Sequence, residues 1–323
     1  MFPQIFSFSL IVFLASALGF AQNSGPATTQ SGGAAVAAAS VPAMPKDPKE
    51  LLLLAARVNG LAGIDRPFHV KANYQTFDAD GKPKDQGVFE EWWAGPEKYK
   101  ISYSSAGFNQ VEYRNNAKTY MVGDVKWPPI PDVMIKQYLL NPLPSEDVVS
   151  KVKYVAKDAR DGTVALRCIY PAAQQEGPAA SGYCFGGKLP AIRLEMPNAQ
   201  IMTFFNTIFR VNDRYVAKQI RVRRASKPYL NADVTVLDYP AKLEDADFVA
   251  PAGATAVQME GTVILHAVIN KNGEIGDLRA ISGPAFLRQA AIESVQMWPY
   301  RPYLLNGRPV KVETQIKVVF KPN

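Results

Sequence analysis

The strict alternation of the last strand-like run constrains the fold of this chain more than any other feature. From Val310 to Phe320 the side chains expected to share one face are Val310, Val312, Thr314, Ile316, Val318 and Phe320, and Lys311, Glu313, Gln315 and Lys317 lie between them. A period of two places successive side chains on opposite faces of a β-strand, so one face is packed and the other is polar. Because only Lys-Pro-Asn follows, the run predicts a strand at a sheet edge with no covering element.

The residues before this run complete a small α+β unit. Gly261–Ile269 (GTVILHAVI) has the pattern of a strand, Asn270–Gly273 that of a hairpin turn, and EIGDLRAIS that of the return strand. A helix follows Ser282-Gly283-Pro284, and its apolar face consists of Leu287, Ala291, Val295 and Trp298. A second turn, LNGR, leads into the closing run. The predicted unit is one helix on a three-stranded sheet whose uncovered face is polar.

This order of pieces resembles the C-terminal domain of TonB, the energy transducer of Gram-negative outer-membrane transport. The matching features are GTVILHAVINKNGEIGDLRAISGP, the helix with RQAAIESVQMW, WPYRPY where the family has a Trp-x-Tyr-x-Pro pattern, and the closing LNGRPVKVETQIKVVF, which place the domain at residues 251–323. The resemblance implies that the last strand binds the TonB box, a short extended segment of an outer-membrane TonB-dependent transporter. Inner-membrane motor proteins are the further partners that it implies. The implied peptide-binding edge consists of Val310, Lys311, Val312, Glu313, Thr314, Gln315, Ile316, Lys317, Val318, Val319 and Phe320.

Elementary physical chemistry supports such an edge without the resemblance. An edge strand presents unpaired N–H and C=O groups, and an extended peptide satisfies them through main-chain hydrogen bonds. Lys311 and Lys317 hinder association of the edge with a copy of itself. The alternative is that the edge is covered by the other domain or by a second copy of the chain.

An uncharged apolar segment opens the chain. Residues Met1–Ala21 end in Gly19-Phe20-Ala21, with small residues at the two positions that a signal peptidase reads, and predict a cleaved signal peptide. The alternative is an uncleaved inner-membrane anchor. Either one places the rest of the chain outside the cytoplasm, and we expect the periplasm. Residues 22–45 are small and mostly polar, and predict a disordered linker.

Short alternating segments dominate residues 46–250. Asp47 and Pro48 predict the start of a helix that ends at Asn59-Gly60, and a second helix is expected at Asp132–Leu140. The predicted strands are Phe68–Phe77, Val88–Trp93, Lys98–Tyr103, Gln110–Arg114, Lys118–Val122, Val152–Ala156, Val164–Tyr170, Ala191–Met196, Ile201–Arg210, Tyr215–Arg224 and Ala232–Leu237. Their regular spacing predicts an antiparallel sheet that curls into an incomplete barrel with helices. The fold class expected for the whole chain is α+β.

The layout of this first domain resembles the LolA-like lipoprotein carriers and outer-membrane lipoprotein-sorting proteins. The shared features are the N-terminal helix, the aromatic and basic strands of GVFEEWWAGPEKYKISY, and a late strand pair. The resemblance implies a half-barrel that closes over a helix, with an apolar cavity for a lipid ligand. It provides the alternative function, a periplasmic carrier or binding protein for lipid or another apolar ligand.

The cysteines agree with an exported protein. Cys168 and Cys184 are the only two, and they lie in strand-like pieces on either side of a Gly/Ala/Gln/Pro-rich connection. This spacing predicts a disulfide across a hairpin in an oxidising compartment, with a contribution of about 3 kcal/mol. A metal pair is disfavoured because no histidines cluster with the two thiols.

Other candidate sites have structural interpretations. His69 and His266 are expected to be strand histidines with hydrogen-bond partners, and Asp78–Gly81 a hairpin turn rather than a calcium loop. Glu90 and Glu91 are expected on opposite faces of a strand, which argues against a paired-carboxylate site. The basic stretch is expected to be a solvated face, with lipid phosphate as the alternative, and consists of Lys218, Arg221, Arg223, Arg224 and Lys227.

These observations predict a binding protein rather than an enzyme. No nucleophile–base pair is visible in the sequence, so an envelope hydrolase is disfavoured, and we expect no catalytic residues, no metal site and no cofactor. The net charge of +7 favours an anionic membrane surface or acidic partners. Nucleic acid is not an expected partner outside the cytoplasm.

Overall fold

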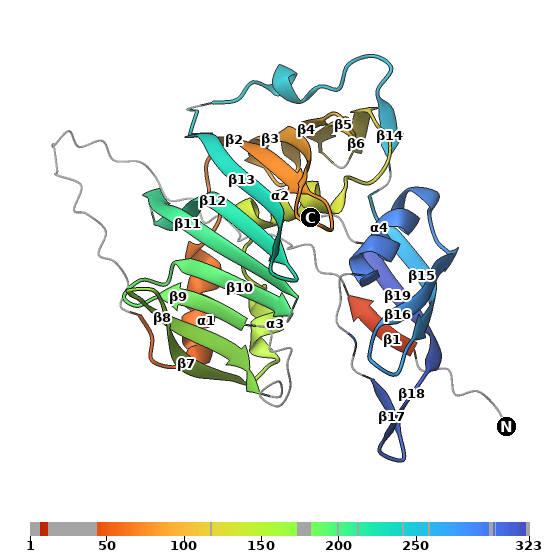
Figure 1. The fold of residues 1–323 in the computed structure, drawn as a ribbon. Coiled ribbons are helices and arrows are strands. Elements are labelled where there is room, and N and C mark those ends of the chain that lie inside the picture. The colour runs from red at the N-terminus through yellow and green to blue at the C-terminus, as the bar shows by residue number, and fades with distance from the viewer. Residues whose placement is uncertain are drawn as a thin grey trace, which may run out of the picture.

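The computed structural model describes residues 7–11, 44–116, 118–172, 182–198, 200–211, 213–240, 242–257, 259–296, 300 and 302–320 (Figure 1). Of the predicted signal peptide, only residues 7–11 are among them, and the predicted linker at 22–45 lies outside them except for Met44 and Pro45. The expected position of Trp298 on the helix also lies outside the described residues. Within the described residues, no helix is long and apolar enough to span a membrane.

One large antiparallel sheet makes up the first part of the molecule. It is 13-stranded in the order β14-β6-β5-β4-β3-β2-β13-β12-β11-β10-β9-β8-β7, and its end strands, β14 and β7, are not paired with each other. The sheet is therefore not closed into a barrel. Its strands are β2 (Phe68–Phe77), β3 (Pro83–Gly95), β4 (Lys98–Ser105), β5 (Asn109–Asn115), β6 (Lys118–Gly123), β7 (Tyr154–Asp161), β8 (Val164–Pro171), β9 (Gly182–Gly186), β10 (Ile192–Asn198), β11 (Ile201–Val211), β12 (Arg214–Arg224), β13 (Lys227–Asp238) and β14 (Thr255–Val257).

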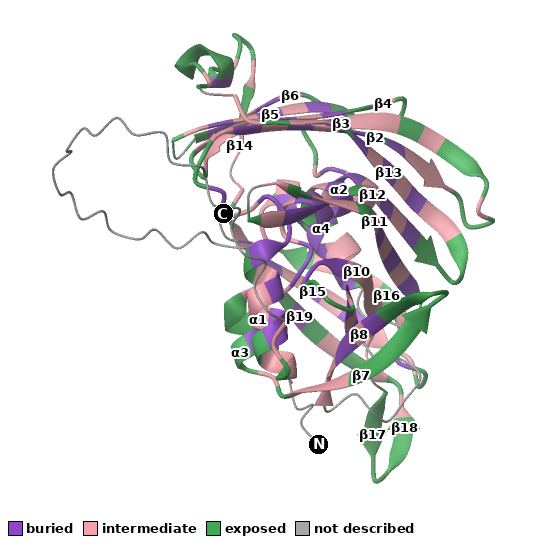
Figure 2. Ribbon diagram, turned by 90° about the vertical axis from the view of Figure 1, so that its left-hand side faces the viewer, coloured by how far each residue is buried: buried purple, intermediate pink, exposed green. Residues whose placement is uncertain are grey.

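Helices cover one face of this sheet. They are α1 (Pro48–Val58), α2 (Ile130–Leu140) and the short α3 (Glu146–Ser150), and a 3-10 turn, η2 (Asp245–Phe248), follows the last long strand. Figure 2 shows buried residues on the sheet face that arches over α2 and along α1. The largest core cluster joins α1 and α2 to the strands, with fully buried Leu51, Ile135, Phe89, Phe185 and Phe205 among its members.

Local signals in the sequence explain why α1 starts and ends where it does. Asp47 caps the helix, because its carboxylate accepts hydrogen bonds from Lys49 N and Glu50 N at 2.9 Å each. Pro48 occupies the first helical position, as predicted. At the other end Gly60 has a φ of 78°, and a Cβ at this position would lie 2.2 Å from Leu140 O. Glycine therefore lets the end of α1 approach the end of α2.

The C-terminal part is a separate small sheet under one helix. It contains β15 (Gly261–Ile269), β16 (Ile275–Ser282) and β19 (Val312–Phe320), with α4 (Ala285–Gln296) packed on one face. The core of this unit is formed by buried residues of both layers: Val263, Leu265, Ala267, Leu287, Ala290, Ala291, Val295, Ile316, Val318 and Phe320. One helix on three strands is the arrangement that the sequence predicts.

Two further pieces of the structure go beyond the prediction for this unit. The segment Tyr303–Leu305 (β17) pairs with Arg308–Val310 (β18) in a separate hairpin. The segment Ser7–Ile11 forms β1, which adds to the small sheet and gives it the order β1-β19-β15-β16 (Figure 1). In addition, β14 lies within the predicted C-terminal domain at 251–323 yet pairs with β6 of the large sheet. The chain therefore crosses from the large sheet to the small one between Val257 and Gly261.

Candidate functional site

The closing strand β19 is held in place by its inward side chains. Ile316 and Phe320 are 4% exposed and Val318 is fully buried, and all three belong to the cluster that includes Leu287 and Ala291 of α4. On one side β19 pairs with β15 along its whole length, from Val312 opposite Ile269 to Phe320 opposite Gly261. Glu313, Gln315 and Lys317 are exposed. The alternation predicted from the sequence is thus present in β19.

The predicted peptide-binding run is divided in the structure. Val310 belongs to β18, Lys311 lies between the two strands, and the residues of β19 itself are Val312, Glu313, Thr314, Gln315, Ile316, Lys317, Val318, Val319 and Phe320. Val310 pairs with Tyr303 rather than with β15. A continuous edge therefore begins at Val312, not at Val310.

The outer side of β19 carries another strand of the same chain. Ser7–Ile11 runs parallel to β19, with Ser7 opposite Gln315 and Ile11 opposite Val319. The expectation that this edge has no covering element is therefore wrong for the chain with its N-terminal segment in place. The cover comes from this segment and not from the large sheet. The role of these residues in binding a partner peptide stays a prediction.

The segment that covers the edge lies inside the predicted signal peptide. β1 falls within residues 1–21, and its five residues pair with Gln315–Val319 of β19. If the predicted cleavage follows Ala21, the processed chain has no β1, and the outer N–H and C=O groups of β19 lose their partners. The covered and the uncovered edge then correspond to two forms of one protein.

Polar side chains cross the solvent face of the small sheet in one line. His266 of β15 has its Nε2 atom 2.5 Å from Glu313 Oε1 of β19, and its Nδ1 atom 3.6 Å from Asp277 Oδ2 of β16. The hydrogen bond to His266 lowers the pKa of the Glu313 carboxyl below its ordinary value. His266 thus links the three strands and fixes Glu313 beside the candidate edge. This agrees with the interpretation of His266 as a strand histidine with polar partners, although the sequence does not identify the two carboxylates.

An aromatic side chain from the first part of the chain contacts the core of the C-terminal unit. Trp127 lies in the loop between β6 and α2, and its ring centroid is 5.5 Å from that of Phe320 and 6.1 Å from that of Phe286. Both contacts have an edge-on geometry, which is favourable for aromatic pairs. Trp127 therefore joins the loop to the end of β19 and to α4.

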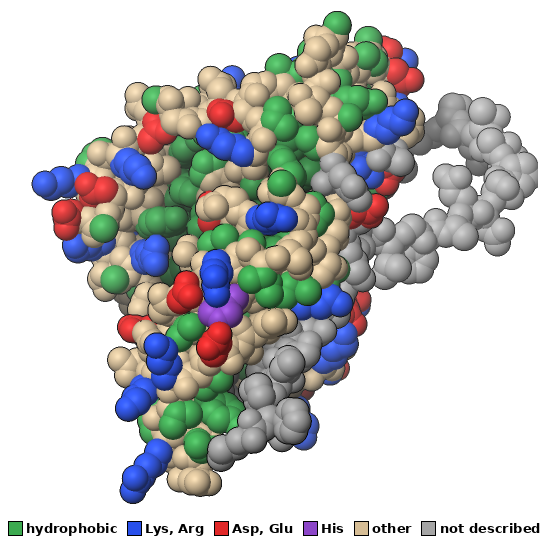
Figure 3. Space-filling view, turned by 90° about the vertical axis from the view of Figure 1, so that its right-hand side faces the viewer, with side chains coloured by type: hydrophobic (Ala, Val, Ile, Leu, Met, Phe, Trp, Pro, Cys, Tyr) green, Lys and Arg blue, Asp and Glu red, His purple; other side chains and the backbone are tan. Residues whose placement is uncertain are grey.

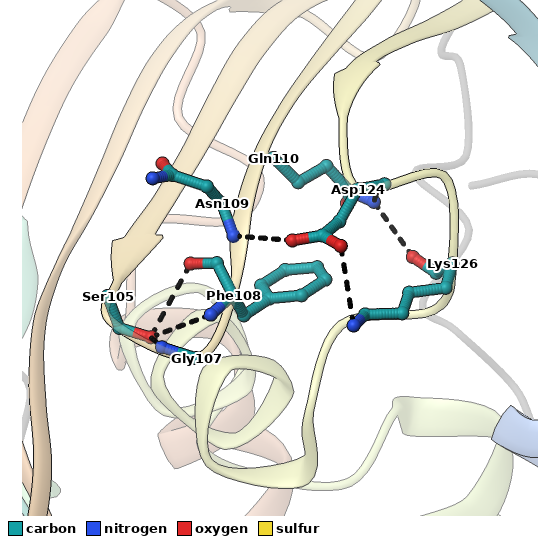
Figure 4. A network of polar contacts seen from close by, with 7 residues as sticks. All are labelled: Ser105, Gly107, Phe108, Asn109, Gln110, Asp124 and Lys126. Carbon is teal, nitrogen blue, oxygen red and sulfur yellow. Dashed lines mark hydrogen bonds and ion pairs between the residues drawn. The ribbon is translucent and has the colours of Figure 1, made fainter.

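Hydrogen bonds at its base shape the loop that carries Trp127. Figure 4 shows the Gln110 side chain directed at this loop, where its Nε2 atom donates to Asp124 O at 2.5 Å and to Lys126 O at 2.8 Å. The Asp124 carboxylate accepts from Asn109 N at 2.9 Å and pairs with Lys126 Nζ at 3.3 Å. Gln110 is 1% exposed, so these bonds are largely shielded from water. The Trp127 position is thereby linked to the ends of β5 and β6.

A small cavity lies between α2 and the large sheet. It measures about 90 Å³ and is lined by Leu61, Ala62, Gly63, Phe68, Glu91, Trp93, Pro96, Tyr99, Lys136, Leu140 and Asn141. Glu91 is 1% exposed, and its Oε2 atom has no hydrogen-bond partner among the described residues. Burial raises the pKa of Glu91 to about 7. Nothing in the sequence marks this group beyond its place on a strand.

The remaining predicted sites have the structural roles expected of them. Glu90 contacts His69 at 2.9 Å on the face opposite Glu91, which confirms that the two carboxylates do not form a pair. Asp78 forms a hairpin turn, with its N–H bonded to Lys82 O at 2.9 Å. Arg221 pairs with Asp233 at 2.7 Å, so part of the basic stretch is neutralised on the sheet.

The predicted disulfide is present. Cys168 and Cys184 are bonded to each other and lie directly opposite on the neighbouring strands β8 and β9. Both side chains are buried, at 2% and 1% exposure. The bond crosses a hairpin, as the spacing in the sequence indicates.

Comparison with known proteins gives two kinds of match. The family model for the Gram-negative bacterial TonB protein C-terminal matches residues 251–322. Among solved structures, a LolA superfamily protein from Nitrosomonas europaea is 9% identical with a TM-score of 0.41, and the match covers 64% of this chain and 99% of that one. A putative outer membrane lipoprotein-sorting protein domain from Vibrio parahaemolyticus is 11% identical with a TM-score of 0.37, covering 63% and 96%.

No curated protein matches the chain at a significant level. The two resemblances stated from the sequence are nevertheless the two that the comparisons find. The C-terminal residues 251–322 match the TonB C-terminal family, and the structural neighbours include LolA-like and lipoprotein-sorting proteins.

Proposed function

We propose that the C-terminal unit binds an extended segment of an outer-membrane transporter by adding it as a strand to the outer side of β19. The protein acts in the periplasm of a Gram-negative cell, as a participant in transport across the outer membrane. Catalysis is not part of this proposal. The family match at residues 251–322 supports the kind of partner.

The observation that carries the proposal is the pairing of Ser7–Ile11 with β19. Five residues in extended conformation pair in parallel with Gln315–Val319, which indicates that the backbone of β19 can accept an added strand. Main-chain pairing of this kind tolerates varied side chains, because the hydrogen bonds come from the backbone. A partner segment is expected to take the place of β1 after the signal peptide is removed.

Glu313 and Lys317 suggest how side chains contribute to selectivity. Both are exposed on the polar face of β19, and His266 holds the Glu313 carboxylate in one position. Charged groups at a sheet edge favour segments of complementary charge and disfavour others. Affinity is expected to come from the backbone and discrimination from these side chains.

Proline substitution tests the proposal directly. Val312→Pro removes a backbone N–H from β19 at a half-buried position that β1 does not reach, and Ile316→Pro does so at its centre. We expect both variants of the chain 22–323 to lose binding to a TonB-box peptide, measured by fluorescence anisotropy. Arg279→Pro, on the opposite edge strand β16, is the matched control and is expected to keep binding. Unchanged affinity in a folded Ile316→Pro variant, at a position that β1 pairs with, would rule out docking on this edge.

The alternative is a carrier of lipid or another apolar ligand through the first domain. The cavity with Glu91 is about 90 Å³, whereas sites for drug-sized ligands measure roughly 300–1,000 Å³. An acyl chain therefore does not fit this cavity as it stands. A larger hollow of about 230 Å³ lies over β8–β11 and is lined mostly by apolar residues, among them Leu166, Leu194, Met196 and Phe204. Mass spectrometry of lipid that co-purifies with the chain distinguishes the two functions, and a stoichiometric lipid would favour the carrier.

A further inference from the structure

The β17–β18 hairpin is an apolar protrusion of the C-terminal unit. Every residue from Pro302 to Pro309 is exposed, and the exposed fractions are 44% for Tyr303, 58% for Leu304 and 55% for Leu305. Figure 1 shows the hairpin extending away from the small sheet, and Figure 3 shows hydrophobic side chains gathered at that lower end of the molecule, with basic side chains beside them. Three consecutive large apolar side chains in water are unfavourable and indicate a contact surface.

The turn gives this protrusion a defined shape. Asn306 and Gly307 connect the two strands and have φ values of 51° and 75°, which is the conformation of a tight two-residue hairpin turn. An isolated two-stranded hairpin is only marginally stable in water. We therefore expect a contact with another surface or medium to stabilise the hairpin further.

The apolar side chains lie on both faces of the hairpin. Residues that are directly opposite in the pairing share a face. Leu305 is opposite Arg308, whereas Leu304 is opposite Pro309 and therefore lies on the other face. A flat protein surface covers one face of a hairpin and leaves the other in water. Leucines on both faces instead fit a medium that surrounds the hairpin.

Basic residues adjoin these leucines. Arg308 lies within the hairpin, and Lys311 is the first residue after the hairpin ends at Val310. Both basic residues are exposed. The acidic residue closest in sequence on the C-terminal side is Glu313, whose carboxylate contacts His266. Apolar side chains flanked by Arg and Lys are typical of segments that enter the headgroup region of anionic membranes, because the long basic side chains reach the lipid phosphates.

We propose that the β17–β18 hairpin inserts into the headgroup region of an anionic lipid bilayer. Strands of three residues are about 10 Å long, which matches the depth of roughly 5–10 Å at which interfacial segments lie. Because Lys311 alone separates β18 from β19, a bound hairpin places the β19 edge close to the membrane surface. This lipid contact is a surface separate from the edge and does not depend on peptide binding there.

Co-sedimentation with vesicles tests the inference. The chain 22–323 is used, so that the apolar residues 1–21 do not bind lipid themselves, and circular dichroism checks that every variant is folded. We expect binding to vesicles of phosphatidylcholine with phosphatidylglycerol and weaker binding to phosphatidylcholine alone. The double variant Leu304→Ser, Leu305→Ser is expected to bind the anionic vesicles at least about tenfold more weakly, because it removes the buried apolar surface.

Two further variants distinguish this contact from nonspecific hydrophobic binding and from a purely electrostatic attraction to the vesicles. Val249→Ser with Ile281→Ser changes two other exposed apolar residues, which are 61% and 48% exposed, and is expected to bind like the parent. Arg308→Glu is expected to weaken binding to the anionic vesicles only. The inference is overturned if the parent chain does not sediment with anionic vesicles, or if the leucine variant binds equally well. It is also overturned if the leucine substitutions instead dissociate a lipid-free dimer, since a second copy would then be the partner.

Discussion

Glu90 and Glu91 are neighbours in the chain but lie in opposite environments. Glu90 contacts His69 at 2.9 Å on the outer face of the large sheet. Glu91 points inward, is 1% exposed, and lies in a cavity with Lys136 and Tyr99. Burial disfavours the charged form of a carboxyl group, whereas a nearby cation favours it. For Glu91 burial is the larger effect, and its pKa is raised to about 7.

The raised pKa of Glu91 predicts a pH-dependent stability. The ordinary glutamate value is 4.5, so between about pH 4.5 and pH 7 the folded chain keeps a proton that the unfolded chain loses. The free energy of unfolding therefore falls as the pH rises through this window, by about 3 kcal/mol at most. Glu91→Gln is expected to reduce this decrease by the contribution of Glu91 and to stabilise the protein at pH 8 more than at pH 4.5. Burial also raises the pKa of Glu195 to about 7, so part of the decrease remains in this variant.

Urea denaturation of the parent and of Glu91→Gln across this pH range measures the effect. Glu274→Gln, an exposed glutamate in the turn after β15, is the matched control and is expected to keep the slope of the parent. An equal slope in Glu91→Gln and the parent would mean that Glu91 is ionised in the folded chain at neutral pH.

Trp127 is the residue that most directly connects the first part of the chain to the candidate site. Trp127→Ala removes the ring that contacts Phe286 and Phe320. We expect a loss of about 1–3 kcal/mol in stability, because the ring is only half buried. Hydrogen exchange should become faster in α4 and β19. Trp92→Ala, which removes a ring stacked on His69 in the large sheet, is the control and is expected to leave exchange in β19 unchanged.

At the scale of elements, the sequence predicts best where the signal is local. The helix α1 begins at Pro48 after its Asp47 cap, and β2 spans Phe68–Phe77 as predicted, because capping and alternation are properties of neighbouring residues. The strand β14 is not predictable in this way, because TAV is too short to show a period and only pairing with β6 makes it a strand. The break at Lys311 between β18 and β19 is hidden in the sequence, because the alternation continues through it.

In the candidate site, too, only the features that depend on neighbouring residues can be predicted from the sequence. The faces of β19 follow from the alternation of Ile316 and Lys317, whereas the contact of Trp127 with Phe320 joins residues far apart in the sequence. The pairing of Ser7–Ile11 with β19 is equally hidden, because the apolar composition of that segment predicts only export. Contacts between segments that are distant in sequence depend on the packed fold, and the local periodicity of hydrophobic residues does not predict them.

The disulfide between two neighbouring strands can be tested by its effect on stability. It joins β8 to β9 close to the β7 end of the large sheet. The double variant Cys168→Ser, Cys184→Ser is expected to lower the free energy of unfolding by about 3 kcal/mol, because the unfolded chain regains the freedom of the closed loop. Denaturation with and without a reducing agent measures this. The reductant should destabilise the parent and leave the variant unchanged; a parent indifferent to reductant would contradict the assignment.

At the scale of the whole molecule, the chain combines a large open sheet with a small α+β unit, for which we propose strand binding. The order of strands places β14, the last strand of the large sheet, immediately before β15, the central strand of the small one. Trp127 adds a second connection between the two parts. A segment bound at β19 therefore lies on a unit that is attached to the large sheet through both β14 and Trp127.

The N-terminal segment covers part of the β19 edge. With residues 7–11 present, five positions of the edge from Gln315 to Val319 are paired. Removal of residues 1–21 is expected to leave these backbone groups open to a partner. The full chain and the processed chain should therefore differ in their affinity for the same peptide.

Amide hydrogen exchange at Gln315–Val319 is the sharpest test of strand addition to β19. In chain 22–323 without peptide, we expect the outward-facing amides of this stretch to exchange quickly. A TonB-box peptide is expected to slow their exchange while leaving that of β16 unchanged. Slow exchange of the same amides in peptide-free chain 22–323, with no further change on adding peptide, would contradict it.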